Sequence, residues 1–145
     1  MIANPLNSSE LVFPILECLH ILGFSLSIGT IAIVDFALLG IGLRQPPAEI
    51  AKQLSLWTAI GLSLMLFTGL LLFSSDPDSY YLNWPFLIKM ALFLSAVIYH
   101  YTRHRKAVAR GQRSAASISL ALWGGVVFGG IFIGFVYPGL TTGRF

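Results

Sequence analysis

The chain has 145 residues, of which nine are lysine or arginine and six are aspartate or glutamate, so only 10% of it is charged. Hydrophobic residues make up 56% and aromatic residues 13% of the sequence, and the mean hydropathy is +0.79. A soluble domain carries about a quarter charged residues, so this chain has too few to cover a surface that faces water. The composition excludes a soluble enzyme, a nucleic-acid-binding module and a disordered tail.

Long gaps between charged residues divide the sequence into membrane spans. A hydrocarbon core of about 30 Å needs about 20 helical residues, and the apolar runs are continuous rather than alternating as in barrel strands. We therefore predict an all-α fold, an integral membrane four-helix bundle in a single domain. The predicted spans are residues 11–43, 53–73, 84–101 and 115–137.

The basic residues predict the orientation of these spans. The first and third loops carry Arg44, Lys52, Arg103, Arg105, Lys106, Arg110 and Arg113. The opposite side carries Arg144 together with Glu10, Asp76 and Asp78. By the positive-inside rule, both termini are expected on the non-cytoplasmic side of the membrane. We interpret the basic third loop as a topology signal rather than as a nucleic-acid or lipid-specific site.

Ionisable residues within the spans carry the functional signal, because a charged group in hydrocarbon is costly unless it is paired or hydrated. The candidates are Glu17, His20 and Asp35 on the first span, and Lys89 and His100 on the third. At about 100° per residue, Lys89 and His100 lie about 20° apart on one helical stripe. Glu17 and His20 share a face of the first span. Both stripes are expected to point into the bundle.

Helical rise sorts these residues into two layers of the membrane. At about 1.5 Å per residue, His20 lies about 10 Å and Lys89 about 8 Å below the outer surface. The outer layer consists of Glu17, His20 and Lys89. The inner layer consists of Asp35, His100, and the interfacial Arg103 and His104. One interpretation is purely structural: Glu17 pairs with Lys89, and Asp35 pairs with His100 or Arg103, to lock the helix register.

The second interpretation is a cofactor site. Buried histidines that face inward from alternate helices are typical of a haem b site, because neutral imidazole is a good iron ligand. We predict His20 and His100 as ligands, with Lys89 and Asp35 neutralising the propionates or relaying protons. The glycines expected to make room for a flat macrocycle are Gly23, Gly29, Gly61, Gly69 and the paired glycines of the fourth span.

The pairing of the ligands stays open. Straight helices place His20 and His100 about 13 Å apart in depth, so one haem between both histidines needs strong helix tilt. The other arrangement has one histidine per haem, with Met65, Met90, Lys89 or no residue on the opposite side.

Three further features receive structural interpretations. His104 shares a helical face with His100, but the basic residues around it favour a solvated interfacial histidine. Cys18, the single cysteine, is expected to be a small core residue. The fourth span contains Gly125-x-x-x-Gly129 and Gly130-x-x-x-Gly134, patterns at which helices pack within the bundle or between copies in a homo-oligomer.

The order of these residues resembles a known family. His20-Ile-Leu-Gly23, Gly29-Thr30, Val34-Asp35 and Leu38-Leu39-Gly40, followed by Lys89 and His100, resemble a family of small bacterial four-helix inner-membrane proteins of unassigned function. More distantly, Leu19-His20 and the stretch from Phe86 to His100 are similar to HemJ-type protoporphyrinogen oxidase and to the membrane domain of copper resistance protein D. The HemJ resemblance implies a haem-bearing bundle, with His20 as an iron ligand and a polar role for Lys89.

These observations lead to one leading hypothesis and two alternatives. The first is a haem-b-binding protein of the bacterial inner membrane that takes part in electron transfer, with quinone or with the other subunits of a redox complex; whether it is an enzyme stays open. One alternative is a protein that handles or transports copper or another metal, although few cysteine or methionine ligands are present. The other is a non-catalytic structural subunit of a membrane complex. The expected partners are the lipid bilayer and, in the first hypothesis, quinone, and no nucleic acid is expected.

Overall fold

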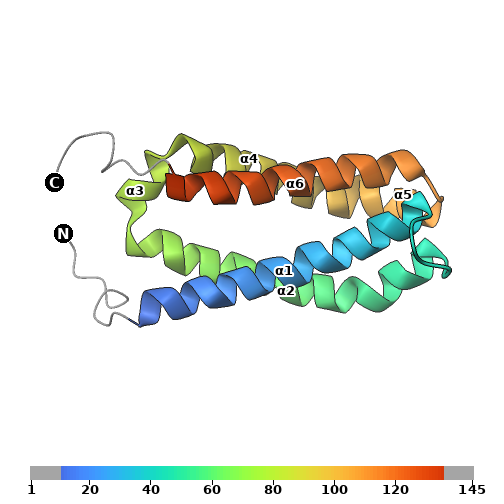
Figure 1. Ribbon diagram of the computed structural model, residues 1–145, viewed down its shortest axis with the longest axis horizontal. Helices are drawn as coiled ribbons and strands as arrows, with labels where there is room; N and C mark the ends of the chain where they lie inside the picture. The colour runs from blue at the N-terminus through green and yellow to red at the C-terminus, as the bar shows by residue number, and fades with distance from the viewer. Residues whose placement is uncertain (1–10, 136–145) are drawn as a thin grey trace. The chain divides into compact units, whose positions relative to one another are not determined.

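The computed structural model of the protein describes residues 11–135, and every regular element in that range is helical (Figure 1). In chain order the elements are α1 (Val12–Leu39), α2 (Pro47–Ser75), α3 (Pro77–Tyr81), α4 (Trp84–Tyr99), the π-helical turn η2 (His100–His104), α5 (Arg105–Ala109) and α6 (Arg113–Phe135). The prediction of an all-α protein is confirmed for this range.

Four helical stretches of the described chain are long and apolar enough to cross a membrane. They are Val12–Leu39, Pro47–Ser75, Trp84–Ala109 and Arg113–Ile133. The prediction of four spans is confirmed by their length and hydropathy, but the third span extends to Ala109 and not only to 101, because η2 and α5 continue α4 without a break. Residues 136 and 137 of the predicted fourth span, and Glu10 and Arg144, lie outside the described residues.

A glycine in the left-handed conformation ends α1. At the end of α1, Gly40 has a φ of 81°, and its N–H donates to the carbonyl of Ala37 at 3.0 Å. The N–H of Ile41 donates to the carbonyl of Phe36 at 2.8 Å. This pair of bonds satisfies the last carbonyls of a helix and favours a residue without a Cβ atom. The helix therefore ends at Leu39, before the predicted limit at residue 43.

Contacts within the chain define two compact units. The first unit is Met1–Thr30 with Leu54–Pro77, and the second unit is Ile31–Gln53 with Asp78–Phe145. The boundary crosses α1 and α2, so each of these helices contributes one part to each unit. The single domain stays a prediction, and the two units are described separately below.

In the first unit, α1 and α2 approach each other closely at two glycines. A Cβ atom on Gly23 would lie 2.9 Å from a backbone nitrogen of α2, and one on Gly61 would lie 2.6 Å from the backbone nitrogen of Ser27. The hydroxyls of Thr30 and Thr58 form a hydrogen bond across the same helices at 2.8 Å. Small residues and interhelical hydrogen bonds are the usual means of helix association in membranes, and here they fix the register of α1 against α2.

In the second unit, α4 and α6 lie side by side and run in opposite directions (Figure 1). The side chain of Leu92 lies against Gly125, and that of Lys89 lies against Gly129. Trp123, only 2% exposed, belongs to the core of this unit. The glycines of α6 thus serve the packing of α6 on α4, which positions the polar end of the third span.

Candidate functional site

A buried acid–histidine pair joins α1 to the third span in the second unit. His104 Nε2 and Asp35 Oδ1 lie 2.5 Å apart, and their side chains are 2% and 0% exposed. Asp35 lies one turn before the end of α1, and His104 is the last residue of η2. A π-helical turn changes the face on which the following residues lie and often occurs at functional sites. His104, at the end of this turn, faces α1, whereas its two neighbours in the sequence, Arg103 and Arg105, are exposed.

Two predictions for this region are wrong. His104 is buried rather than solvated, and the partner of Asp35 is His104 rather than His100 or Arg103. The basic neighbours of His104 do not determine its direction, because each residue of a helix turns by about 100° from the last. The signal available in the sequence was the spacing of His100 and His104, which predicts that they share a face. Asp35 and His100 do belong to one cluster, as the inner layer predicts.

His100 completes this cluster by stacking on His104. The centroids of the two rings are 5.2 Å apart, and their planes are inclined by 26°. His100 Nδ1, His104 Nδ1 and Asp35 Oδ2 are buried and have no hydrogen-bond partner among residues 11–135. Buried polar atoms nearly always have a partner, so these three atoms give the cluster the capacity to bind a further polar group.

The first unit holds the other predicted ligand, His20. Thr68 Oγ1 lies 2.7 Å from the carbonyl oxygen of Leu64 and 3.0 Å from His20 Nδ1. A hydroxyl has a single proton, and the shorter contact to the carbonyl takes it, so Oγ1 accepts a hydrogen bond from His20 Nδ1–H. In this tautomer the lone pair of the ring lies on Nε2. Histidine ligands of metals are oriented by an outer hydrogen-bond partner in the same way, so His20 fits the role of a ligand.

Most of the glycines predicted to make room for a macrocycle are closely packed. Gly23 and Gly61 lie at the contact of α1 with α2, and Gly125 and Gly129 lie under side chains of α4. A Cβ atom on Gly69 would lie 3.0 Å from Cε1 of the His20 ring. Gly29 and Gly124, in contrast, have no atom within 4 Å of an added Cβ, and the haem cradle stays a prediction. The donor atoms fit an iron ligand, and Gly69 leaves room for the ring of His20.

The side chain of Lys89 extends over two glycines of α6. The start of its side chain lies on Gly129, and its Nζ atom is 3.5 Å from the position that a Cβ atom on Gly130 would occupy. Lys89 therefore packs against α6 within the second unit. His20 belongs to the first unit. The outer layer that would bring these two residues together stays a prediction.

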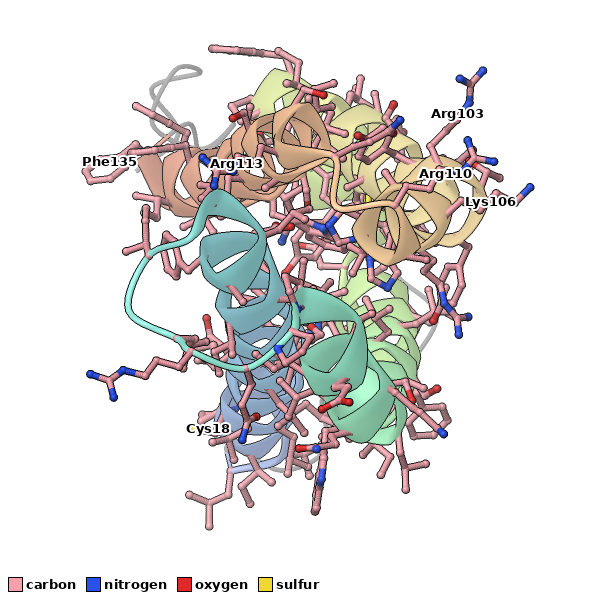
Figure 2. The ribbon with its side chains drawn as sticks, turned by 90° about the vertical axis from the view of Figure 1, so that its right-hand side faces the viewer. Cys18, Arg103, Lys106, Arg110, Arg113 and Phe135 are labelled. Atoms are coloured by element: carbon pink, nitrogen blue, oxygen red, sulfur yellow. The ribbon has the colours of Figure 1, made fainter. Side chains whose placement is uncertain are left out.

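Two residues of the first span face outward, contrary to expectation. Glu17 is exposed on α1, so the prediction that it points into the bundle is wrong. Cys18 is exposed as well, and Figure 2 shows its side chain outside the ribbon rather than in the core. Within the described range, no group of three or more His, Cys, Asp or Glu side chains is placed to hold a metal ion.

No protein-family model, curated protein or solved structure matches the chain. The family resemblance and the haem site therefore stay predictions that rest on the residues themselves. The described structure adds two local arrangements to them, the His20–Thr68 hydrogen bond and the Asp35–His104–His100 cluster.

Proposed function

We propose that this protein binds haem b in the bacterial inner membrane and transfers electrons, with quinone or a subunit of a redox complex as its partner. The orientation of His20 by Thr68 carries the proposal, because it gives the ring the tautomer of an iron ligand. Bound haem would supply one-electron chemistry. The contribution of the chain is the axial imidazole and the hydroxyl that orients it.

The remaining candidates have supporting roles in this proposal. His100 is the second candidate ligand, and its support is a buried Nδ1 atom with no hydrogen-bond partner among the described residues. Lys89 is proposed to neutralise haem carboxylates through its ammonium group. Asp35 is proposed to act through His104, to which it is hydrogen-bonded and on whose ring His100 stacks.

A pyridine haemochrome assay on protein purified from cells supplied with a haem precursor tests the proposal. The wild type is expected to contain haem b, and His20→Ala is expected to lose it. His100→Ala distinguishes the two ligand arrangements, because it loses haem only if His100 is a ligand. Ser95→Ala, at an exposed position of α4, is the control and should retain the wild-type haem content. A colourless wild-type protein would rule the proposal out.

We also propose that both termini lie on the non-cytoplasmic side. The seven basic residues in and beside the first and third connections support this orientation. Alkaline phosphatase fused to the C-terminus should then be active, and green fluorescent protein fused at the same place should not fluoresce. The reverse pattern would contradict the orientation.

Neither alternative function gains support from a particular contact. Small residues are common where membrane helices meet, and Gly125 and Gly129 already pack on α4. The second glycine pattern ends at Gly134, whose packing lies outside what the structure describes. Purification of a colourless protein together with partner chains would favour the structural alternative over electron transfer.

A further inference from the structure

A basic groove lies at the polar end of α4 and α6 in the second unit. Its volume is about 530 Å³, and its lining includes Arg103, Lys106 and Arg110 but no acidic residue. Figure 2 shows these three side chains extending outward from the same end of the ribbon. Arg103 belongs to η2, Lys106 to α5, and Arg110 follows the end of α5, and all three line the same groove. The groove therefore concentrates positive charge in one place.

The other basic residues of this region point elsewhere. The guanidinium carbon of Arg105 lies 5.8 Å from the centroid of the Tyr101 ring, in a cation–π contact. A guanidinium nitrogen of Arg113 lies 3.7 Å from the position of a Cβ atom on Gly40, beside the end of α1. Neither arginine lines the groove. A topology signal depends only on the number of basic residues. It does not explain why some of these side chains line the groove and others lie outside it.

The groove continues from its basic rim onto an apolar wall. Tyr99, Ala115 and Ile118 line this part. The Tyr99 hydroxyl donates a hydrogen bond to the carbonyl of Ala115 at 3.3 Å, which links the two helices at this wall. Ile118 is 48% exposed and lies on α6 one turn after Ala115, within the apolar part of that helix. The groove thus has a cationic end, formed by Arg103, Lys106 and Arg110, and an apolar wall beside it.

We infer that this groove binds an anionic phospholipid, with its phosphate on Arg103, Lys106 and Arg110 and an acyl chain along Ile118. Basic pockets between spans at a membrane surface are the usual sites for acidic headgroups, and guanidinium groups form strong paired hydrogen bonds with phosphate. An acidic peptide or free phosphate would use the cationic rim but not the apolar wall. Tyr99 of the apolar wall lies beside His104, with the ring centroids 6.2 Å apart, but the three cationic residues are none of the proposed haem residues, so the two proposals can fail separately.

Native mass spectrometry of the full chain in detergent, with phosphatidylglycerol or phosphatidylcholine added, tests this inference. Phosphatidylglycerol is expected to bind and phosphatidylcholine is not. Arg103→Gln should weaken phosphatidylglycerol binding about fivefold, and the triple variant R103Q/K106Q/R110Q about a hundredfold. Arg105→Gln is the matched control, since it removes the same charge two residues away but outside the groove, and it should bind as the wild type does.

Each competing explanation has a distinct outcome. Equal losses in Arg103→Gln and Arg105→Gln would show a general effect of surface charge and overturn the inference. Displacement of the lipid by millimolar inorganic phosphate would identify a free-anion site and overturn it too. Equal binding of the two lipids would leave no role for the cations. The thermal unfolding of each variant without lipid shows whether it is folded. If the triple variant is unfolded, the comparison of the single variants tests the inference.

Discussion

The imidazole of His104 and the carboxylate of Asp35 meet at 2.5 Å, from Nε2 to Oδ1, where neither side chain reaches solvent. The contact links the end of α1 to η2, which are 69 residues apart in the sequence. It therefore connects the first span to the third within the second unit. Removing one member of such a pair leaves the other buried without its partner, and that is more costly than removing both.

We expect Asp35→Ala and His104→Ala each to lower the free energy of unfolding by about 3–5 kcal/mol. The double variant should lose much less than the sum of the two, because neither polar group is then left alone. Denaturation in detergent, followed by tryptophan fluorescence, measures all four proteins of this cycle. Additive losses would mean that the two side chains stabilise the protein independently of their contact.

A second prediction concerns Thr68, which orients His20. Thr68→Val keeps the shape of the side chain but removes the oxygen that accepts from Nδ1, so we expect about a 10- to 100-fold loss of haem affinity. Thr68→Ser keeps the hydroxyl and should retain most of the affinity. Titration of the haem-free protein with haem, followed by its absorbance, gives the dissociation constants. If valine and serine variants bind haem alike, the hydroxyl does not orient a ligand.

The close approach of α1 and α2 leads to a third prediction. A Cβ atom on Gly61 would lie 2.6 Å from the backbone nitrogen of Ser27 and 2.8 Å from the carbonyl oxygen of Gly23. Backbone atoms cannot move aside as a flexible side chain can, so Gly61→Ala should destabilise the protein by about 1–3 kcal/mol. Gly29→Ala is the control, because no atom lies within 4 Å of its added Cβ. The control should be neutral or stabilising by up to about 1 kcal/mol, since alanine favours helix more than glycine does.

The scarcity of charge predicts the four spans because the cost of charge in hydrocarbon acts on every residue of a span. The ends of the spans follow different physics. The left-handed Gly40 ends α1 with backbone hydrogen bonds, and α5 ends after Ala109 although the basic stretch continues on both sides of it. Polarity therefore predicts which segments cross a membrane and does not predict where their helices stop.

The candidate site was predictable only in part, for a similar reason. Asp35, His20 and His100 are conspicuous in the sequence because each is an ionisable residue in an apolar run. His104 stands among basic residues, and its burial depends on the direction that η2 gives it and on the partner that α1 supplies. Neither of these is a property of the local sequence.

A fourth prediction concerns Asn83, which precedes α4 and is 2% exposed. Its Oδ1 atom accepts from the N–H of Phe86 at 3.3 Å, and its Nδ2 atom donates to the carbonyl of Ile133 on α6 at 3.2 Å. Serine caps a helix as asparagine does but is too short to reach α6. We therefore expect Asn83→Ser to lose about 1 kcal/mol and Asn83→Ala about 2 kcal/mol, measured by denaturation in detergent. Equal losses would mean that the cap contributes nothing.

The last prediction separates the two roles of Lys89. Its side chain covers Gly129 and reaches towards Gly130, so its methylene groups contribute to packing whether or not its charge has a function. Lys89→Met keeps a chain of similar length and apolar surface, and we expect the free energy of unfolding of the haem-free protein to change by less than about 1.5 kcal/mol.

The charge should matter only when haem is bound. If the ammonium group neutralises a haem carboxylate, Lys89→Met should weaken haem binding about tenfold, as expected for the loss of one hydrogen bond to a charged group. Lys89→Arg keeps the positive charge and serves as the control for binding. Unchanged haem affinity in Lys89→Met would limit Lys89 to packing on α6. A large loss of stability in the haem-free variant would instead show that its ammonium group has a structural partner.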